Sequence, residues 1–560
     1  MEASSAPING KALSEGPSRG SEDPLKDVQD SSTASAAAPD PRGESTTEPL
    51  GEIDVSESSV DGMGALQFTD EENCGFFAKT SPHKEPALVP SSSQRTCGTA
   101  NGAKSQSTGR PGSVENINLS AAVNIYALPS EERTWSLIQQ YFHKTGQLLP
   151  FIHEKSFCET YFQMKKERFR KVRRTWLGLL NIVLAIAASL STKGDMSAEK
   201  RIQESDVYYQ RANGLCDRDS KRNASLEMVQ YLLILGQYLQ GTQKSVQAWT
   251  AHGLAISAAY QLGLHSPDAN RGFPPVERET RKRTWFGTLS MTFGRPCTIP
   301  EFYVKLEMPS QDLQMLSSPV ESNTYRILDG SFFTAAVKLY VILYNVLESC
   351  YGANLGFEVS TSPIDAMSGI LEGQRQLDEW RLQQLPSLGL KVCDSPLSLD
   401  DVEKMDTGSI IRHRFEVVLF VRYNNLRILV HRRCLESFLD PVQTQGDTLA
   451  TSETRLLQQM GLSSVISCVE SAMSIISVVH NMSAGSGWRP FNAALVIFGS
   501  LIVASKERDR NPSAWIMVSH SRPYIDTAAE ALRQLDPGNP VVERCQEYLS
   551  QLSAILDPLS

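Results

Sequence analysis

The stretch that decides the fold reads Ala248-Trp-Thr-Ala-His-Gly-Leu-Ala-Ile-Ser-Ala-Ala-Tyr-Gln-Leu-Gly-Leu-His265. Its apolar residues recur at three- and four-residue spacing, which predicts an amphipathic helix. Four small residues at helical spacing predict that a second helix packs closely against it: Gly253, Ala255, Ala258 and Ala259. Gly263 predicts the end of the helix, because a residue without a Cβ adopts the left-handed conformation at little cost.

The same periodicity recurs from residue 131 to the C-terminus. It predicts helices at 131–143, 154–168, 172–192, 199–218, 224–239, 245–263, 276–293, 321–352, 363–384, 405–438, 453–483, 491–507, 521–535 and 540–556. No segment shows the alternation typical of strands. Helices with one apolar face each must bury those faces on one another. We therefore expect an all-α fold, a large multi-helix domain preceded by a disordered acidic N-terminal region.

The first 125 of the 560 residues differ in composition from the rest. They are rich in Ser, Gly and Pro, and their 18 acidic and 9 basic residues account for the whole formal charge of −9. We expect disorder here, because little apolar area is available for burial. An acidic and aromatic island at 61–77 is either a partner-binding segment or ordinary solvated linker. The helical body divides into 126–310 and its continuation 311–560.

The cysteines are widely spaced, with no two closer than about 20 residues. A zinc cluster needs ligands at short spacings such as C-x2-C, so this sequence predicts no zinc cluster. No secretory signal opens the chain, and we expect reduced thiols packed in helices of an intracellular protein. The apolar runs 176–190 and 491–504 are too short to span a membrane and predict buried helices.

Three segments, taken in order, resemble one known family. They are Tyr141-Phe-His-Lys-Thr-Gly-Gln-Leu-Leu-Pro-Phe-Ile-His153-Glu-Lys-Ser-Phe157, the helix and Leu-Gly-Leu-His265 corner of 248–265, and Arg281-Lys-Arg283-Thr-Trp285-Phe286 followed by Gly294-Arg295-Pro296 and Met308-Pro309. Together they resemble the fungal-specific transcription factor domain, or middle homology region, of zinc binuclear cluster transcription factors. A looser likeness lies at 423–432.

The resemblance implies a nuclear protein that regulates RNA polymerase II transcription. The family's zinc and DNA binding come from an N-terminal cysteine cluster that this sequence lacks, so no cofactor is expected in this chain. DNA contact is expected only through an upstream cluster exon or a partner factor. Other implied partners are the transcription machinery, regulators and a homo- or heterodimer mate, with no membrane. The segment after Gly287-Thr288 is also about six residues shorter than in the family, for which a gene-model error and a genuine variant are both open.

The motif residues themselves favour structural roles. Arg281 and Arg283 precede Trp285 on one helix, where their stems can pack beside the ring. In Gly294-Arg295-Pro296 the arginine can bond helix C-terminal carbonyls or contact an effector, and both alternatives stay open. The scattered histidines His143, His153, His252 and His265 are expected to hydrogen-bond or cap helices rather than bind a metal.

The densest basic run has seven cations within ten residues: Lys165, Lys166, Arg168, Arg170, Lys171, Arg173 and Arg174. It is either a solvated helix face or a functional patch for nuclear import or phosphate contact. The neutral remainder of the body argues against an autonomous nucleic-acid binder.

No catalytic motif appears, neither His-Glu-x-x-His nor Gly-x-Ser-x-Gly, so we expect no enzyme. The leading hypothesis is the regulatory domain of a transcription factor. The alternative is a stand-alone helical interaction protein that modulates intact family members, and a third hypothesis is a metabolite-binding receptor.

Overall fold

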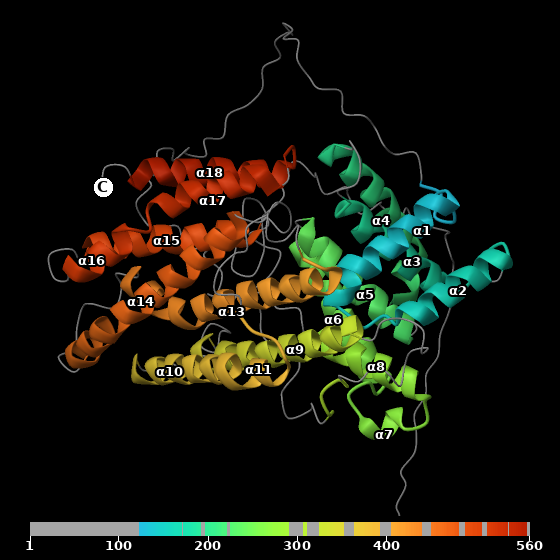
Figure 1. Ribbon diagram of the computed structural model, residues 1–560, viewed down its shortest axis with the longest axis horizontal. Helices are drawn as coiled ribbons and strands as arrows, with labels where there is room; N and C mark the ends of the chain where they lie inside the picture. The colour runs from blue at the N-terminus through green and yellow to red at the C-terminus, as the bar shows by residue number, and fades with distance from the viewer. Residues whose placement is uncertain are drawn as a thin grey trace, which may run out of the picture. The chain divides into compact units, whose positions relative to one another are not determined.

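The structure, a computed structural model, describes residues 123–170, 172–191, 197–220, 224–242, 244–289, 306–310, 324–351, 363–392, 405–439, 450–480, 488–506, 512–535 and 537–556 (Figure 1). Every regular element in these ranges is helical, which confirms the all-α fold class. The disorder expected for residues 1–125 falls almost entirely outside the described residues, which begin at 123. The island 61–77, Lys171 and the Gly294-Arg295-Pro296 motif also lie outside them.

The helices between residues 131 and 288 form the first group. In chain order they are α1 (Glu131–Tyr141), η1 (Phe142–Gly146, a π-helical turn), α2 (Glu154–Lys166), α3 (Arg174–Ser189), α4 (Ala198–Ser220), α5 (Leu226–Gly241), α6 (Ser245–Gln261), α7 (Pro267–Asn270) and α8 (Pro275–Thr288). N-capping side chains fix the first residues of several of these helices. Ser130 Oγ accepts a hydrogen bond from the Arg133 N–H at 3.3 Å, and Ser225 Oγ accepts one from Met228 at 3.1 Å. Each serine thus satisfies a backbone donor that has no partner within the helix.

Helix α3 lies at the centre of this group. Every residue from Trp176 to Ala188 is buried, and α3 packs against α1, α4 and α5. At Gly178 an added Cβ would lie 2.1 Å from the Sγ of Cys216, so α3 and α4 can approach this closely only because residue 178 has no side chain. We call the buried apolar residues around α3 the N-terminal core; it extends from Leu137 to Phe286 and also takes in Phe333 and Val337.

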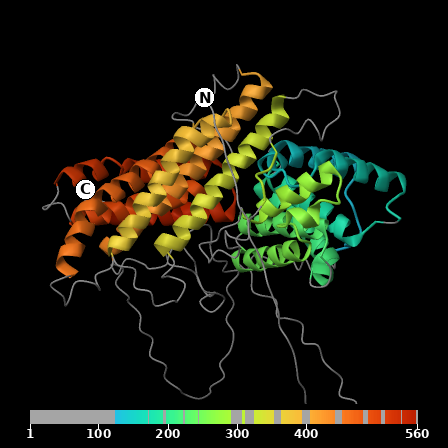
Figure 2. The same ribbon diagram turned by 90° about the horizontal axis from the view of Figure 1, so that it is seen from below.

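The remaining helices surround a C-terminal core, the buried apolar residues from Phe332 to Leu556. They are α9 (Thr324–Tyr351), α10 (Pro363–Glu379), η5 (Trp380–Gln384, π-helical), α11 (Leu385–Ser387), α13 (Thr407–Leu439), α14 (Ala450–His480), α15 (Trp488–Lys506), α16 (Pro512–Ser519), α17 (Pro523–Leu535) and α18 (Pro540–Leu556). Helices α9, α10 and α13 run side by side (Figure 2). The fully buried Trp380 donates from Nε1 to the Ala335 carbonyl at 3.1 Å and so ties η5 to α9.

Helix α9 belongs to both cores. Its Phe333 and Val337 pack in the N-terminal core, whereas Phe332 and Leu339 pack in the C-terminal core. A polar contact adds to this connection, because Arg414 of α13 donates from Nη1 to the His143 carbonyl of η1 at 2.8 Å. The two cores therefore share an element and are not packed independently.

Two helical segments, Gly330–Tyr351 and Gly461–His480, are long and apolar enough to cross a membrane. They are not the two runs that the sequence analysis weighed. In their most apolar windows, 67% and 56% of the residues are buried inside the protein. Leu339 and Ile475, one from each segment, are part of the C-terminal core. Helices that are apolar on most sides and covered by other helices are typical of the interior of a large helical domain.

The structure corrects three local predictions. The helix expected at 276–293 ends at Thr288. The short helices α7 and α16 were not anticipated. Gly253 is exposed, and an added Cβ there would meet no atom within 4 Å, so its expected role in close helix packing was wrong. Ala255 and Ala259 of the same helix are fully buried, as expected.

Candidate regulatory surface

The chain turns sharply after α6 at Gly263. Its φ of 65° lies in the left-handed region, as its position in the sequence predicted. An added Cβ would lie 2.8 Å from the Cβ of Ala269, so a larger residue is also excluded by space. The turn directs the chain into α7 and then α8, which carries the arginine motif.

Asn270 and Arg281 hold this turn together. Asn270 donates from Nδ2 to the carbonyls of Leu264 at 3.2 Å and Ser266 at 2.8 Å, and its Oδ1 accepts from Arg281 Nε at 2.6 Å. Arg281 also donates from Nη2 to the Leu262 carbonyl at 2.8 Å, which caps the end of α6. Arg281 was among the motif residues expected from the sequence, whereas Asn270 was not, although asparagine in a Ser-Pro-Asp-Ala-Asn segment is a recognisable turn signal.

Arg283 connects α8 to residues 306–310. Its Nε donates to Glu279 Oε1 at 2.9 Å and its Nη2 donates to the Ser310 carbonyl at 3.1 Å. The same Glu279 oxygen accepts from the Ser310 N–H at 3.0 Å. Both charged side chains are almost completely buried, with exposed fractions of 6% and 9%. The pair therefore anchors residues 306–310, which include the Met308-Pro309 motif, to α8.

The aromatic motif residues meet in the same corner. The fully buried Trp285 ring lies 5.2 Å from Tyr260 and 5.6 Å from His265, measured between ring centres. Its neighbour Thr284 bonds the Phe151 carbonyl at 3.3 Å, two residues before the N-cap of α2.

That cap is His153, whose Nδ1 accepts from the Ser156 N–H at 3.4 Å. The structure thus brings the described motif residues of α6 and α8 to one corner, and Thr284 links that corner to the turn before α2 through the Phe151 carbonyl. Arg281, Arg283 and Trp285 are buried, whereas His153, Gly263 and His265 are half-buried.

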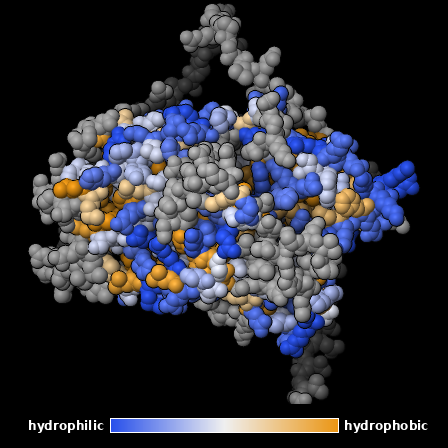
Figure 3. Space-filling model, in the orientation of Figure 1, coloured by the Kyte–Doolittle hydropathy of each residue, from blue (hydrophilic) through white to orange (hydrophobic). Residues whose placement is uncertain are grey.

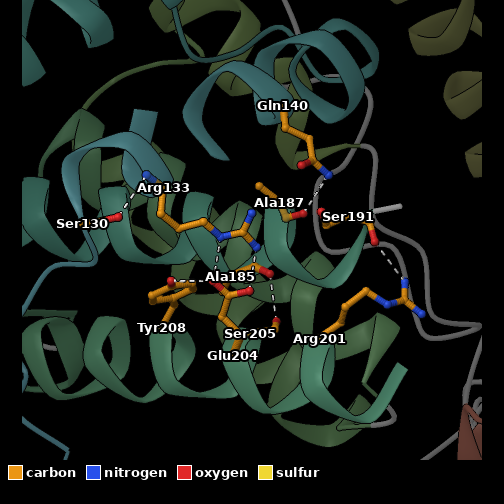
Figure 4. Close-up of polar contacts among 10 residues, drawn as sticks. All are labelled: Ser130, Arg133, Gln140, Ala185, Ala187, Ser191, Arg201, Glu204, Ser205 and Tyr208. Atoms are coloured by element: carbon orange, nitrogen blue, oxygen red, sulfur yellow. Dashed lines mark hydrogen bonds and ion pairs between the residues drawn. The ribbon is translucent and has the colours of Figure 1, made fainter. Parts of the chain in front are cut away.

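A second polar network fixes α1 on α4 (Figure 4). Arg133 of α1 reaches Glu204 of α4 with both arms of its guanidinium, at 2.9 Å and 2.6 Å, and Tyr208 donates to the same carboxylate at 2.9 Å. The hydrogen bonds from Arg133 hold the pKa of Glu204 below its ordinary value. Two parallel bonds of this kind fix geometry as well as charge.

Around this pair, side chains bond backbone carbonyls at the end of α3: Gln140 to Ala187 at 3.0 Å, Ser205 to Ala185 at 2.8 Å and Arg201 to Ser191 at 3.3 Å. Sequence reasoning missed this network. Arg133 and Glu204 are 71 residues apart, and no local pattern links them.

The basic run spans the last residues of α2, the turn after it and the first residue of α3. Helix α2 ends at Lys166, and Arg168 and Phe169 follow with φ of 52° and 55°, both left-handed. The helix expected to reach residue 168 is therefore two residues shorter, and the run is not one continuous helix face. Non-glycine residues pay a steric penalty in this conformation, so the turn is held by its surroundings. The Phe169 N–H donates to the Met164 carbonyl at 2.8 Å.

The cations of this run fall into two sets. Those at its ends are occupied: Lys165 pairs with Glu131, Arg173 pairs with Glu227, and Arg174 bonds the carbonyls of Gly214 and Leu215. The middle three, Lys166, Arg168 and Arg170, are exposed and form no ion pair with any residue that the structure describes. The charge available to a partner is therefore concentrated at the tip of the α2–α3 turn.

An aromatic cluster lies beside this turn. Trp135 of α1 has its ring centre 4.8 Å from that of Phe162 and 6.1 Å from that of Tyr161, both on α2. Tyr161 in turn lies 6.3 Å from Phe169 of the turn. Phe162 is 46% exposed, which is unusual for a phenylalanine already packed against tryptophan.

We call this region the basic–aromatic surface and define it by Trp135, Phe162, Lys166, Arg168 and Arg170; the buried Tyr161 packs against both rings. Figure 3 shows a small apolar patch bordered by hydrophilic residues where Figure 1 places α1 and α2. An exposed aromatic face with cations at its edge can bind acidic or aromatic groups by ion pairing, stacking and apolar contact.

The described histidines do not suggest chemistry of another kind. His252 is 3% exposed, and burial lowers its pKa to about 4, so it is neutral near pH 7. Within the described ranges no three His, Cys, Asp or Glu side chains are grouped as a metal ion would require. What the site offers is a binding surface on a firmly packed scaffold.

The model of the fungal-specific transcription factor domain matches residues 138–382. The chain is 30% identical over 546 residues to transcription factor FBD3 of Fusarium pseudograminearum, covering 90% of this chain and 70% of that protein. It is 33% identical over 446 residues to transcription factor FBD3 of Gibberella moniliformis, covering 76% of this chain. An ABC-transporter-regulating transcription factor of Aspergillus oryzae is 24% identical over 67% of this chain. The chain spans 58% of the Gibberella protein and 42% of the Aspergillus protein.

Proposed function

Because the chain belongs to the fungal-specific transcription factor domain family and is thus a regulator of transcription, we propose that it controls RNA polymerase II genes through protein contacts of its helical region. The observation that carries the proposal is the family match, which includes the motif segments of α6 and α8 and the turn before α2. In the corner formed by α6 and α8, Arg281, Arg283 and Trp285 are buried, so we assign these residues the role of a scaffold. Regulatory contacts then belong to exposed surfaces built on it, foremost the basic–aromatic surface.

Contact with DNA is proposed to be indirect. The ten cysteines of this sequence lack the spacing of a zinc cluster. Three exposed cations of the densest basic run, Lys166, Arg168 and Arg170, have no described ion pair and lie at the end of α2 and in the turn after it. Site-specific DNA binders usually present a broader basic surface. The chain would reach promoters with a partner factor, including an intact family member with which it forms a heterodimer. We further propose nuclear residence, with Lys166, Arg168 and Arg170 available to the import machinery.

A tethered reporter tests the regulatory role. The full chain is fused to a heterologous DNA-binding domain in yeast, upstream of a reporter gene. We expect reporter transcription to change several-fold relative to the DNA-binding domain alone. The Asn270→Ala variant, which loosens the motif corner, should lose the effect, and the exposed Asp268→Ala variant should keep it. Equal reporter output from the fusion and from the DNA-binding domain alone would count against the proposal.

The indirect route to DNA needs its own test. Purified full chain is mixed with promoter fragments in a gel-shift experiment at several salt concentrations. We expect weak complexes without sequence preference. A site-specific complex formed by the chain alone, weakened by salt, would show that the chain binds DNA itself.

A further inference from the structure

The N-terminal part of the sequence contains a segment whose chemistry matches the basic–aromatic surface. Residues 61–77 include Asp61, Asp70, Glu71 and Glu72 but no lysine or arginine. The same segment contains the apolar residues Met63, Leu66, Phe68, Phe76 and Phe77. We infer that residues 61–77 dock in cis on the basic–aromatic surface formed by α1, α2 and the turn that follows α2.

The apolar contacts of the proposed docking depend on Phe162. Its ring packs at 4.8 Å from Trp135 yet keeps 46% of its area exposed, so one part of the ring faces solvent. Phenylalanine side chains of the segment can pack edge-to-face on such a ring pair, and these contacts add to the burial of apolar area. The receiving rings of Trp135 and Phe162 need no rearrangement, because both already pack on the buried Tyr161.

The charged contacts of the proposed docking depend on the cations at the end of α2 and in the turn after it. Lys166, Arg168 and Arg170 are exposed within five residues and have no ion pair in the described structure. Asp70, Glu71 and Glu72 are consecutive in the segment, so three carboxylates arrive together. Opposite charges arranged in this way favour binding and fix its register, although each exposed pair adds only a modest affinity.

The length of chain that joins the segment to the surface favours residues 61–77 over other binding partners. Forty-five residues, 78–122, separate the segment from the described chain. A coil of that length spans about 35–40 Å on average.

The described chain also begins near the part of the molecule that carries the basic–aromatic surface. Glu131, eight residues after the start at residue 123, is paired with Lys165 next to the turn, and Trp135 follows one helical turn later. A tethered segment experiences an effective concentration on the order of millimolar, so weak contacts suffice.

The docking has a regulatory meaning that rests on the proposed function. A docked segment covers both the cations proposed for import and the exposed aromatic face proposed for regulatory contacts. A modification or a partner that releases the segment would expose the two together. The chain would then be controlled by its own N-terminal region through charge.

Site-specific photocrosslinking of the full chain tests the docking. The photoreactive residue p-benzoylphenylalanine is placed at position 162, and the matched control carries it at position 382 of η5, where Leu382 is 71% exposed. After irradiation, the crosslinked peptides are identified by mass spectrometry. We expect position 162 to crosslink to residues 61–77 of the same chain and position 382 not to do so.

Charge variants then separate docking from mere proximity. Lys166→Glu, Arg168→Glu and Arg170→Glu introduced together should lower the crosslinking yield about tenfold. Adding Asp70→Lys, Glu71→Lys and Glu72→Lys to that protein should restore most of the yield. The three turn residues have no described ion partners, so circular dichroism and thermal unfolding should match those of the parent chain.

Three results would overturn the docking. One is the absence of crosslinks between position 162 and residues 61–77. Another is a yield that charge reversal leaves unchanged. The third is a crosslinked product with twice the mass of the chain, which would assign the surface to a second copy. None of these results depends on transcription, so the tethered reporter can succeed where the docking fails, and the reverse.

Discussion

At the scale of single residues, buried polar side chains carry the motif corner. Asn270 is 6% exposed and joins Arg281 to the backbone carbonyls that end α6. A buried donor or acceptor that loses its partner costs more than an ordinary hydrogen bond gains, and a buried charge costs still more. The corner is therefore sensitive to changes in a residue that touches no ligand.

Asn270→Ala should lower the free energy of unfolding by about 2–4 kcal/mol, because it removes the acceptor of Arg281 Nε and the side-chain hydrogen bonds to the Leu264 and Ser266 carbonyls. The matched control is Asp268→Ala in the same short helix, whose side chain is 77% exposed and whose change should stay within about 0.5 kcal/mol. Urea denaturation of the full chain measures both. Similar midpoints for the two variants would mean that Asn270 does not organise the turn.

At Arg168, by contrast, a substitution is predicted to raise the free energy of unfolding. With φ at 52°, it occupies a conformation that penalises a Cβ but not glycine. Arg168→Gly should raise the free energy of unfolding by about 0.5–1 kcal/mol, after the greater chain entropy of glycine is included. Arg168→Ala removes the same charge and keeps the Cβ, so it should leave stability nearly unchanged. If both variants unfold at the same urea concentration, the turn does not store this strain.

At the scale of elements, helices α3 and α4 approach each other closely at one glycine. This approach depends on Gly178, where an added Cβ would lie 2.1 Å from Cys216 Sγ and 3.6 Å from Cys216 Cβ. The sulfur is therefore the obstacle, and the backbone spacing would tolerate a methyl group once the sulfur is gone.

Gly178→Ala should destabilise the protein by about 1–3 kcal/mol through overpacking. The double variant Gly178→Ala with Cys216→Ala should recover at least about 1 kcal/mol relative to the sum of the single changes. Gly241→Ala is the control, because an added Cβ there meets nothing within 4 Å. A double-mutant cycle by chemical denaturation measures the coupling, and purely additive effects would rule out the clash.

Much of the element order was predictable from the sequence, because long helices such as α3, α13 and α14 bury many residues at regular spacing. The short helices α7 and α16 begin at prolines and have too few turns to show a period. The left-handed pair Arg168 and Phe169 contains no glycine to indicate it, so the helix predicted at 154–168 extends two residues beyond the end of α2. The Arg133–Glu204 pair could not be foreseen, since it depends on how α1 and α4 pack on α3.

At the scale of the whole molecule, two buried histidines couple stability to pH. Burial lowers the pKa of His252 in α6 and of His431 in α13 to about 4, with Arg427 adding to the effect at His431. In the unfolded chain the pKa of histidine is about 6.5. Between these values the unfolded chain binds protons that the folded protein cannot, so stability falls as pH decreases through this window.

At about pH 5, each histidine should cost about 2 kcal/mol of stability relative to pH 7 and above. His431→Gln should remove about half of that loss. The comparison between the variant and the parent chain isolates the histidine, because Glu416, whose pKa is raised by burial, acts in the opposite direction in both proteins. Urea unfolding across this pH range measures the difference, and identical pH profiles would mean that His431 takes up its proton in the folded state.

The regulatory role itself is tested most directly by chromatin immunoprecipitation of the tagged full chain in the organism that encodes it, combined with nascent-transcript sequencing after its rapid depletion. We predict enrichment at promoters, and changed transcription of the nearby genes within minutes of depletion. Absence of promoter enrichment, together with unchanged nascent transcripts, would contradict the assignment of this chain as a regulator of RNA polymerase II transcription.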